Sequence, residues 1–303
     1  MKSRRCIVLA VMLSRFALQL TVAAAEEYQD VRTVKPDLEV PAVQPGPPKA
    51  GIRVLYRGRP GDATGELPKA VLMLPENWKA GESWPVFVEL PGNGGYRDPR
   101  GDECSGRPED CCLGYGLTEG KDWIWLCLPF LNGDGSQQAT TWWGDASDYN
   151  PAATIDFWEQ QLEHVCEDYG GDRRRMVLAG FSRGAIAVNA LGLRSEKIAD
   201  RWMAFFPNSH YDGVRRWPFP ESSRQAAGER LRRLRNRPQL ISGEGNQVEE
   251  TRRYLQASGI DPGNIRFLPT GFINHTDRWV LRPCPARDTA RQWLKALSDR
   301  SSD

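Results

Sequence analysis

The sequence has almost no net charge, because 40 lysines and arginines are balanced by 39 aspartates and glutamates, which leaves +1 over 303 residues. The total charge therefore gives no electrostatic footprint for nucleic acid or an anionic membrane surface, and we predict neither as a partner. The 29 glycines and 22 prolines stay below the roughly 25–30 % that marks low-complexity chains. With 40 % apolar residues, the chain can bury a sizeable core in one or two domains.

A long apolar run is also missing at the N-terminus. Basic residues precede a short apolar run at 6–13, Arg15 interrupts the stretch, and three alanines at 23–25 offer a cleavage point. This order is typical of a signal peptide, and the run is too short for a membrane anchor. We predict a leader over 1–25 and export, periplasmic or extracellular, by the general secretory or the twin-arginine route. The alternative is a frayed N-terminal helix of a cytosolic protein.

Six of the seven cysteines lie beyond that leader. An even number in an exported chain predicts up to three disulfides, whose pairing the sequence does not reveal. A zinc site among the clustered cysteines is the alternative, but adjacent cysteines are poor zinc ligands and no histidine lies near them, so we predict no metal. The six are Cys104, Cys111, Cys112, Cys127, Cys166 and Cys284.

The remaining sequence divides into a tether and one folded domain. Residues 26–50 contain five prolines and few large apolar groups, which predicts an extended tether. Over 51–303, short apolar runs alternate with helical patterns, which predicts an α/β domain with a mostly parallel sheet and helices on both faces. A polar, Cys-rich stretch at 98–115 predicts a surface insert. The expected strands are 52–56, 70–74, 85–90, 123–128, 176–179, 202–206, 239–242 and 265–268, and the expected helices are 152–169, 184–193, 222–235, 249–257 and 286–297.

The strand expected at 176–179 leads directly into Gly180-Phe181-Ser182-Arg183-Gly184, and a helical pattern follows at once. G-x-S-x-G between a strand and a helix is the pattern of a nucleophile elbow. A tight, strained turn lifts the serine, and the flanking glycines leave room for neighbouring backbone. We predict Ser182 as the nucleophile, because a serine that only caps a helix would need neither glycine.

Acyl transfer by a serine also needs donors for an oxyanion. The backbone N–H of the residue after the nucleophile, Arg183, is the first of these. The second is expected in the Gly-rich loop at 91–95, which follows a predicted strand, and Asn93 and Gly94 are the candidates. The alternative for this loop is an ordinary turn, since Asn-Gly and Gly-Gly pairs are common there.

Only three histidines can serve as the base. His164 is expected in the middle of a helix and is interpreted as a packing or surface residue. His275 follows the last expected strand, and its loop lies at the same edge of a parallel sheet as Ser182. We therefore predict His275 as the base. His210 follows the strand at 202–206, also at this edge, and is expected to touch the substrate.

A carboxylate is expected after the strand at 239–242, because elbow hydrolases carry the order Ser, Asp or Glu, His along the chain. Asn246 stands where an aspartate is expected, and an amide cannot stabilise an imidazolium as a charge does. Glu244 is the first candidate for the acid, Asp212 the second and Glu249 the third. The sequence does not decide between them.

Taken together, these features make the chain resemble an α/β-hydrolase over residues 53–297. The resemblance rests on the order of the strands, the loop at 91–95, the elbow and the late His275. Within that superfamily the chain is similar to secreted esterases of the polyhydroxybutyrate depolymerase and feruloyl esterase kind. Pro91 and Asn246 depart from the pattern, because many relatives have a histidine before the Gly-rich loop and an aspartate as the acid.

The 11 tryptophans include several in loops expected at the carboxyl end of the sheet. Trp142, Trp143 and Trp279 are predicted to line a substrate pocket together with His210, and aromatic walls suit sugar rings, feruloyl groups and acyl chains alike. Packing is the alternative for each of these tryptophans.

The sequence thus predicts a secreted serine hydrolase that cleaves a small-molecule or polymer-linked carboxylic ester through an acyl-enzyme, with no cofactor. The alternatives are a serine peptidase with the same fold and a hydrolase-fold binding protein without catalysis. The natural ester and the oligomeric state stay open.

Overall fold

The computed structural model describes residues 28–300, except for 59–67, 101, 147 and 261–262. The leader predicted over 1–25 lies outside the described residues. Among the helices that are described, none combines the length and the apolar character needed to cross a membrane.

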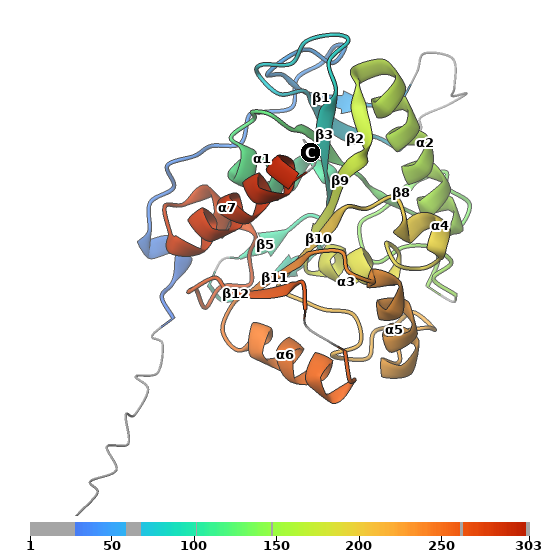
Figure 1. The fold of residues 1–303 in the computed structure, drawn as a ribbon, viewed down its shortest axis with the longest axis vertical. Coiled ribbons are helices and arrows are strands. Elements are labelled where there is room, and N and C mark those ends of the chain that lie inside the picture. Colours follow the sequence, from blue (N-terminus) through green and yellow to red (C-terminus); the bar gives the residue numbers. More distant parts are fainter. Residues whose placement is uncertain (1–27, 59–67, 101, 147, 261–262, 301–303) are drawn as a thin grey trace, which may run out of the picture.

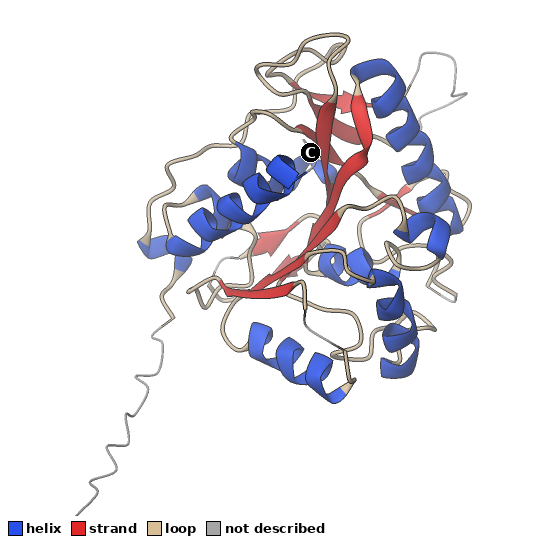
Figure 2. Ribbon diagram, in the orientation of Figure 1, coloured by secondary structure: helices blue, strands red, loops and turns tan. Residues whose placement is uncertain are grey.

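An eight-stranded sheet forms the centre of the molecule (Figure 2). Along the order β1-β2-β6-β3-β9-β10-β11-β12, β2 runs against both neighbours, and every pair from β6 to β12 is parallel. The predicted fold class is confirmed, and each expected strand matches one strand of this sheet. The strands are β1 (Arg53–Tyr56), β2 (Ala70–Met73), β3 (Trp84–Leu90), β6 (Ile124–Cys127), β9 (Gly171–Phe181), β10 (Ala204–Asn208), β11 (Gln239–Gly243) and β12 (Ile265–Pro269).

Helices cover both faces of the sheet (Figure 1). Side chains alternate along each strand, so Val86 and Val88 of β3 pack into one core and Phe87 into the other. The first core takes apolar side chains from α2, α3, α5 and α6, and the second takes them from α1 and α7. The helices are α1 (Leu113–Thr118), α2 (Ala152–Tyr169), α3 (Arg183–Ala190), α4 (Glu196–Ala199), α5 (Arg224–Leu231), α6 (Gln247–Ala257) and α7 (Pro285–Arg300).

Short elements escaped the sequence analysis. The insert at 98–115 contributes β5 (Glu103–Cys104), which pairs with β4 (Tyr96–Arg97), and it leads into α1. A second two-stranded ribbon joins β7 (Phe130–Leu131) to β8 (Gln138–Ala139). Strands of two residues and a helix of six leave too little periodicity to recognise.

Glu89, on β3, fastens the end of the insert to the sheet. Its fully buried carboxylate accepts the backbone N–H groups of Cys112, Leu113 and Gly114, where α1 begins, and the indole N–H of Trp125, all at 2.8–3.0 Å. Burial raises the pKa of Glu89, while these hydrogen bonds act in the opposite direction.

The hydrogen bonds of Glu89 also decide whether this carboxylate could bind a metal ion. Within the described part of the chain, Glu89 with Cys111 and Cys127 is the group of side chains close enough to share a metal ion. Because both carboxylate oxygens of Glu89 already accept two N–H groups each, this cluster does not fit a metal.

None of the six cysteines in the described residues forms a disulfide. The prediction of up to three disulfides therefore differs from the structure. Five of the six are buried, where a thiol packs as a small apolar side chain. An even count alone does not distinguish such packing from cross-linking.

The Pro-rich residues 28–50 differ from the expected tether, because they lie along the domain beside α7 (Figure 1). Val31 is buried, and its N–H donates to Asn274 Oδ1 at 2.7 Å. Backbone bonds join Gln29 to Gly271 and to Ile273. An extended segment with few apolar groups can still bind to the domain when the backbone of a loop forms hydrogen bonds with it.

An ion pair holds the middle of this segment. Asp37 accepts two hydrogen bonds, at 2.5 and 2.8 Å, from the largely buried guanidinium of Arg287 on α7. These hydrogen bonds lower the pKa of Asp37, with burial acting in the opposite direction. The pair therefore stabilises the fold above the ordinary pKa of an aspartate, and its contribution is lost as the pH falls through the lowered pKa.

We expect Asp37→Ala to lower the free energy of unfolding by about 1 kcal/mol at pH 7, a value reduced because the Asp37 side chain is about half exposed. The difference from the wild type should begin to shrink at pH 3, below the ordinary pKa of an aspartate, because the unfolded chain then binds the proton before the folded one does. Urea unfolding at the two pH values measures both effects. Glu39→Ala, at an exposed residue of the same segment, is the control, and an equal loss in both variants would contradict the assignment.

Candidate active site

Ser182 occupies a sharp turn between β9, which ends at Phe181, and α3, which begins at Arg183. Its φ of 52° and ψ of −111° are unusual for a serine. The flanking glycines make the turn possible, because a Cβ on Gly180 would lie 2.4 Å from the Gly184 carbonyl carbon, and one on Gly184 would lie 2.1 Å from the Leu90 oxygen. The geometry is that of the predicted elbow.

Buried Asn208, at the end of β10, braces the turn from below. Its carbonyl oxygen accepts the Ser182 N–H at 3.0 Å, and its side-chain oxygen accepts the Ser242 hydroxyl at 2.7 Å and the Trp279 indole N–H at 3.1 Å. Asn208 thus links the elbow to β11, the strand that precedes Glu244. The sequence analysis missed it, because an asparagine at a strand end gives no signal of its own.

His275 lies between the serine and a carboxylate. Its Nε2 is 3.0 Å from Ser182 Oγ, and its Nδ1 is 2.6 Å from Glu244 Oε1. These three side chains come from the loops after β12, β9 and β11, which all end at one edge of the sheet. The structure therefore brings together Ser182, His275 and the first of the three candidate acids.

Glu244 is nearly buried beside His275. Burial acts to raise the pKa of its carboxyl, but the hydrogen bond and charge of His275 outweigh burial and lower the pKa. Glu244 is therefore ionised at neutral pH, and it accepts the Nδ1–H of His275. This bond fixes the ring with Nε2 toward the serine.

The other candidate acids lie elsewhere. Asp212 is fully buried and pairs with Arg230 at 2.8 Å. Burial raises the pKa of Asp212 to about 6, although Arg230 opposes that shift. Glu249 pairs on the surface with Arg252 and Arg253. Asn246 is the residue before α6, and its side chain does not cap that helix.

One of the two loop residues expected to hold an oxyanion is already engaged. The N–H of Gly94 donates to the Thr140 carbonyl at 2.6 Å, which corrects its expected role. Asn93 remains on this loop, and its side-chain oxygen accepts the Trp142 N–H at 2.9 Å. On the other side of Ser182, the N–H of Arg183 is at the first position of α3, where helix geometry leaves it without an internal acceptor.

His210 stacks on His275, with ring centroids 4.8 Å apart. Its Nδ1 donates to the Ser209 carbonyl at 2.8 Å. Burial, followed by the charge of His275, lowers the pKa of His210 to about 4. It is therefore a neutral ring at the site, with Nε2 as the acceptor nitrogen.

Two further rings contact His275. Tyr96 lies edge-on at 5.0 Å and Phe181 at 4.9 Å between ring centroids. Phe181 is inside the elbow motif, but its contact with His275 cannot be read from the sequence. Tyr96 lies on β4, just before the insert, and no motif in the sequence points to a functional residue there.

The three tryptophans predicted to line a pocket have different surroundings. Trp279 is fully buried beneath the elbow, so it is a packing residue. Trp142 is half-buried and contacts Trp217, which in turn contacts His210 at 5.2 Å. Trp143 is buried, and it borders a cavity of about 320 Å³ on the far side of this aromatic group.

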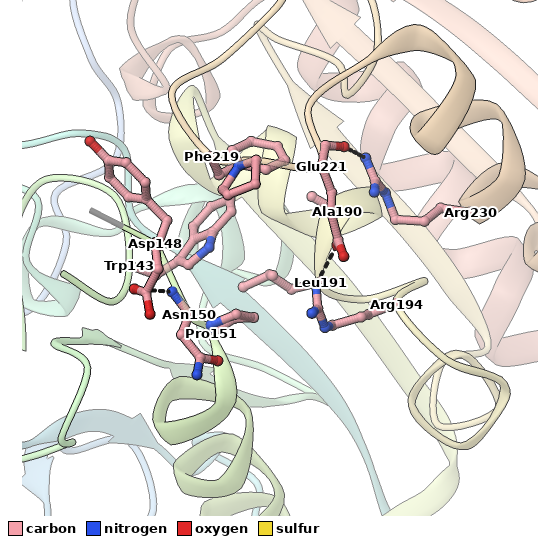
Figure 3. Close-up of a pocket in the computed structure, with 12 residues that line it drawn as sticks. Trp143, Asp148, Asn150, Pro151, Ala190, Leu191, Arg194, Phe219, Glu221 and Arg230 are labelled. Carbon is pink, nitrogen blue, oxygen red and sulfur yellow. Dashed lines mark hydrogen bonds and ion pairs between the residues drawn. The ribbon is translucent and has the colours of Figure 1, made fainter. Parts of the chain in front are cut away.

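Both apolar and polar side chains line that cavity. Figure 3 shows Asp148 and Asn150 on one side, Glu221 paired with Arg194 on the other, and Phe219 between them. The opposite charges balance, so the cavity suits a neutral group better than an ion. Two of its lining residues, Trp143 and Phe219, contact the ring of Trp142.

Comparisons with known proteins place this geometry in a wider group. No protein-family model matches the sequence, and no curated protein is similar to it in sequence. Three matching solved structures are a thermostable esterase (12 % identity, TM-score 0.51), dipeptidyl peptidase 4 of Porphyromonas gingivalis (13 %, 0.51) and a variant of esterase Est22 (16 %, 0.50).

The matches cover 80, 83 and 81 % of this chain, and 62, 36 and 80 % of the three other chains, respectively. The chain thus spans less than two thirds of the thermostable esterase and about a third of the peptidase. At these identities the likeness concerns the fold. The chain has the α/β-hydrolase fold, as the sequence predicted.

We expect Glu244→Gln to lower kcat about 10³-fold on any substrate that Ser182 attacks, because the amide cannot stabilise the imidazolium. Asp212→Asn should reduce stability, since Arg230 loses its charged partner, while kcat per folded molecule stays within about threefold. Turnover of a p-nitrophenyl ester, with circular dichroism to quantify folded protein, measures both. The opposite order of the two kcat values would make Asp212 the acid.

Proposed function

We propose that this chain is a serine hydrolase that cleaves carboxylic esters. The observation that carries the proposal is the pair of contacts made by His275, 3.0 Å from Ser182 Oγ and 2.6 Å from Glu244 Oε1, on the sharp turn of the elbow. A hydroxyl that can pass its proton to a histidine held by a carboxylate is an activated nucleophile.

In the first step, Ser182 Oγ attacks the ester carbonyl carbon while its proton moves to His275 Nε2. The negative charge that develops on the carbonyl oxygen is stabilised by the N–H groups of Arg183 and Asn93. Glu244 stabilises the imidazolium. Collapse of the tetrahedral intermediate breaks the bond to the alcohol oxygen, which takes the proton from Nε2 and leaves an acyl-enzyme.

In the second step, a water molecule takes the place of the alcohol. His275 Nε2 removes one of its protons, the hydroxyl oxygen attacks the acyl carbon, and the same N–H groups stabilise the new oxyanion. The proton then returns to Ser182 Oγ as the acid leaves. The sequence of steps calls for no metal or organic cofactor.

The proposal extends to the surroundings of the site. His210 and Trp217 lie beside His275 and would form one wall of the ester site, with Trp142 next to them. The substrate is proposed as a small-molecule or polymer-linked ester. Export by the leader at 1–25 remains a prediction from the sequence.

Labelling of purified protein with a fluorophosphonate, followed by peptide mass mapping, tests the nucleophile. We expect one modification, at Ser182, and a rate of labelling that falls at least 10²-fold in His275→Ala. Ser182→Ala is the negative control, and Ser136→Ala, at a serine on the β7–β8 turn, is the matched control. The absence of labelling in a folded sample would favour a hydrolase-fold protein that only binds its ligand.

Substrate panels then separate ester from amide chemistry. We expect turnover of short p-nitrophenyl esters with kcat/KM well above that for p-nitroanilides of matched acyl groups. Because the same three residues cleave amides in peptidases, a preference for the amides would replace the esterase proposal by the peptidase alternative.

A further inference from the structure

The side chain of Arg183 is a buried cation at the reacting centre. It is fully buried, and among the described residues it forms no ion pair with a carboxylate. Its guanidinium carbon lies 4.2 Å from the centroid of the Phe130 ring. Burial lowers the pKa of Arg183 to about 9. A charge is costly to bury without a counter-ion. The hydrogen bonds of the guanidinium must therefore offset the cost of burying it.

Those hydrogen bonds go to backbone carbonyls of two loops. Nη1 donates to Trp142 at 2.6 Å and to Ala139 at 3.2 Å, which span a segment of residues 139–142 that we call the bracing loop. Nη2 donates to Gly106, in the insert, at 3.2 Å. One side chain, attached next to the nucleophile, therefore fixes two segments that are distant in sequence.

The bracing loop in turn fixes the oxyanion loop, residues 91–95. The Thr140 carbonyl accepts the Gly94 N–H at 2.6 Å, and the Trp142 N–H donates to Asn93 Oδ1 at 2.9 Å. The insert closes the arrangement, because a Cβ on Gly106 would lie 2.2 Å from the Thr140 oxygen and 2.8 Å from the Gly94 nitrogen. Asn93 is thus held by the hydrogen bond that its own side chain accepts and by the hydrogen bond that the next residue, Gly94, donates.

We propose that the Arg183 guanidinium is a positioning residue, which sets Asn93 in the oxyanion hole by holding the bracing loop. This inference rests on the proposed function and deepens it. The backbone N–H of Arg183 supplies one oxyanion donor, and its side chain places the loop that supplies the other. Arg183 therefore fixes both donors, one through its own backbone and one through its side chain. Their separation stays constant while the substrate oxygen gains charge.

Replacement of the guanidinium should slow the chemical step without weakening substrate binding. We expect Arg183→Met to lower kcat for p-nitrophenyl acetate about 10²-fold, close to the loss of one oxyanion donor, with KM within twofold. Arg183→Lys retains a charge and fewer donors, and its kcat should lie between the other two. Should Arg183→Met fail to fold, Arg183→Lys carries the same comparisons.

Arg53 provides a matched control. It is also a buried arginine that donates to backbone carbonyls, those of Pro108 and Cys111, and it stacks on Trp125 at 4.6 Å. We expect Arg53→Met to cost stability but to leave kcat within threefold. Equal losses of kcat in Arg53→Met and Arg183→Met would show general destabilisation and overturn the proposal, as would an unchanged kcat in Arg183→Met.

A double-mutant cycle tests the route of the effect. Asn93→Ala removes the oxygen that accepts the Trp142 N–H, and it should also lower kcat. If Arg183 acts through this loop, the double variant should lose much less than the product of the two single losses. Losses that multiply would mean that the two residues act separately, and would overturn the proposal.

Hydrogen exchange supplies a readout that does not depend on activity. We expect amides in residues 91–95 and 139–142 to exchange at least tenfold faster in Arg183→Met than in the wild type, and to stay unchanged in Arg53→Met. Unchanged exchange in Arg183→Met would overturn the positioning role. A wild-type protein that shows the protected loops but no labelling by a fluorophosphonate would instead refute the proposed function alone.

Discussion

The contact of α3 with the end of β3 is the constraint on which the site depends. Without side chains at Gly180 and Gly184, the start of the helix comes close enough to the Leu90 carbonyl to force the backbone of Ser182 into its unusual conformation. That approach also places Arg183 at the start of α3, directly after the serine, and its buried side chain donates to carbonyls of the surrounding loops. The turn of the proposed nucleophile and its surroundings therefore depend on one close contact of backbone.

The acidic groups of the protein show how surroundings assign different tasks to the same chemistry. Glu244 contacts His275 at the carboxyl edge of the sheet and keeps its charge, whereas Asp212 pairs with an arginine in the interior. Glu89 lies in the interior and accepts backbone N–H groups. Each carboxylate is matched to the donors within its reach, and only the first is placed to assist a proton transfer.

The sheet, the elbow and His275 could be predicted because each depends on local pattern or on the order of strands. The partners of Glu244 and Asp212 could not be predicted, since both residues follow a strand at the same edge, and only the structure shows that Glu244 contacts His275 whereas Asp212 pairs with Arg230. The Gly94 N–H donates to the Thr140 carbonyl, and such a contact between two loops cannot be recognised from the sequence of either loop. For the same reason a count of cysteines misled, as thiol packing and cross-linking share one composition.

Residues 28–31 support the loop of His275 from a distant part of the chain. Val31 and Gln29 supply hydrogen bonds to the loop of His275, across a separation of 243 residues in the case of Val31 and Asn274. Such contacts are non-local, and no sequence pattern in either segment reveals them. Trimming the chain back to the start of β1 would therefore leave every candidate site residue in place and still remove the backbone partners of Gly271, Ile273 and Asn274.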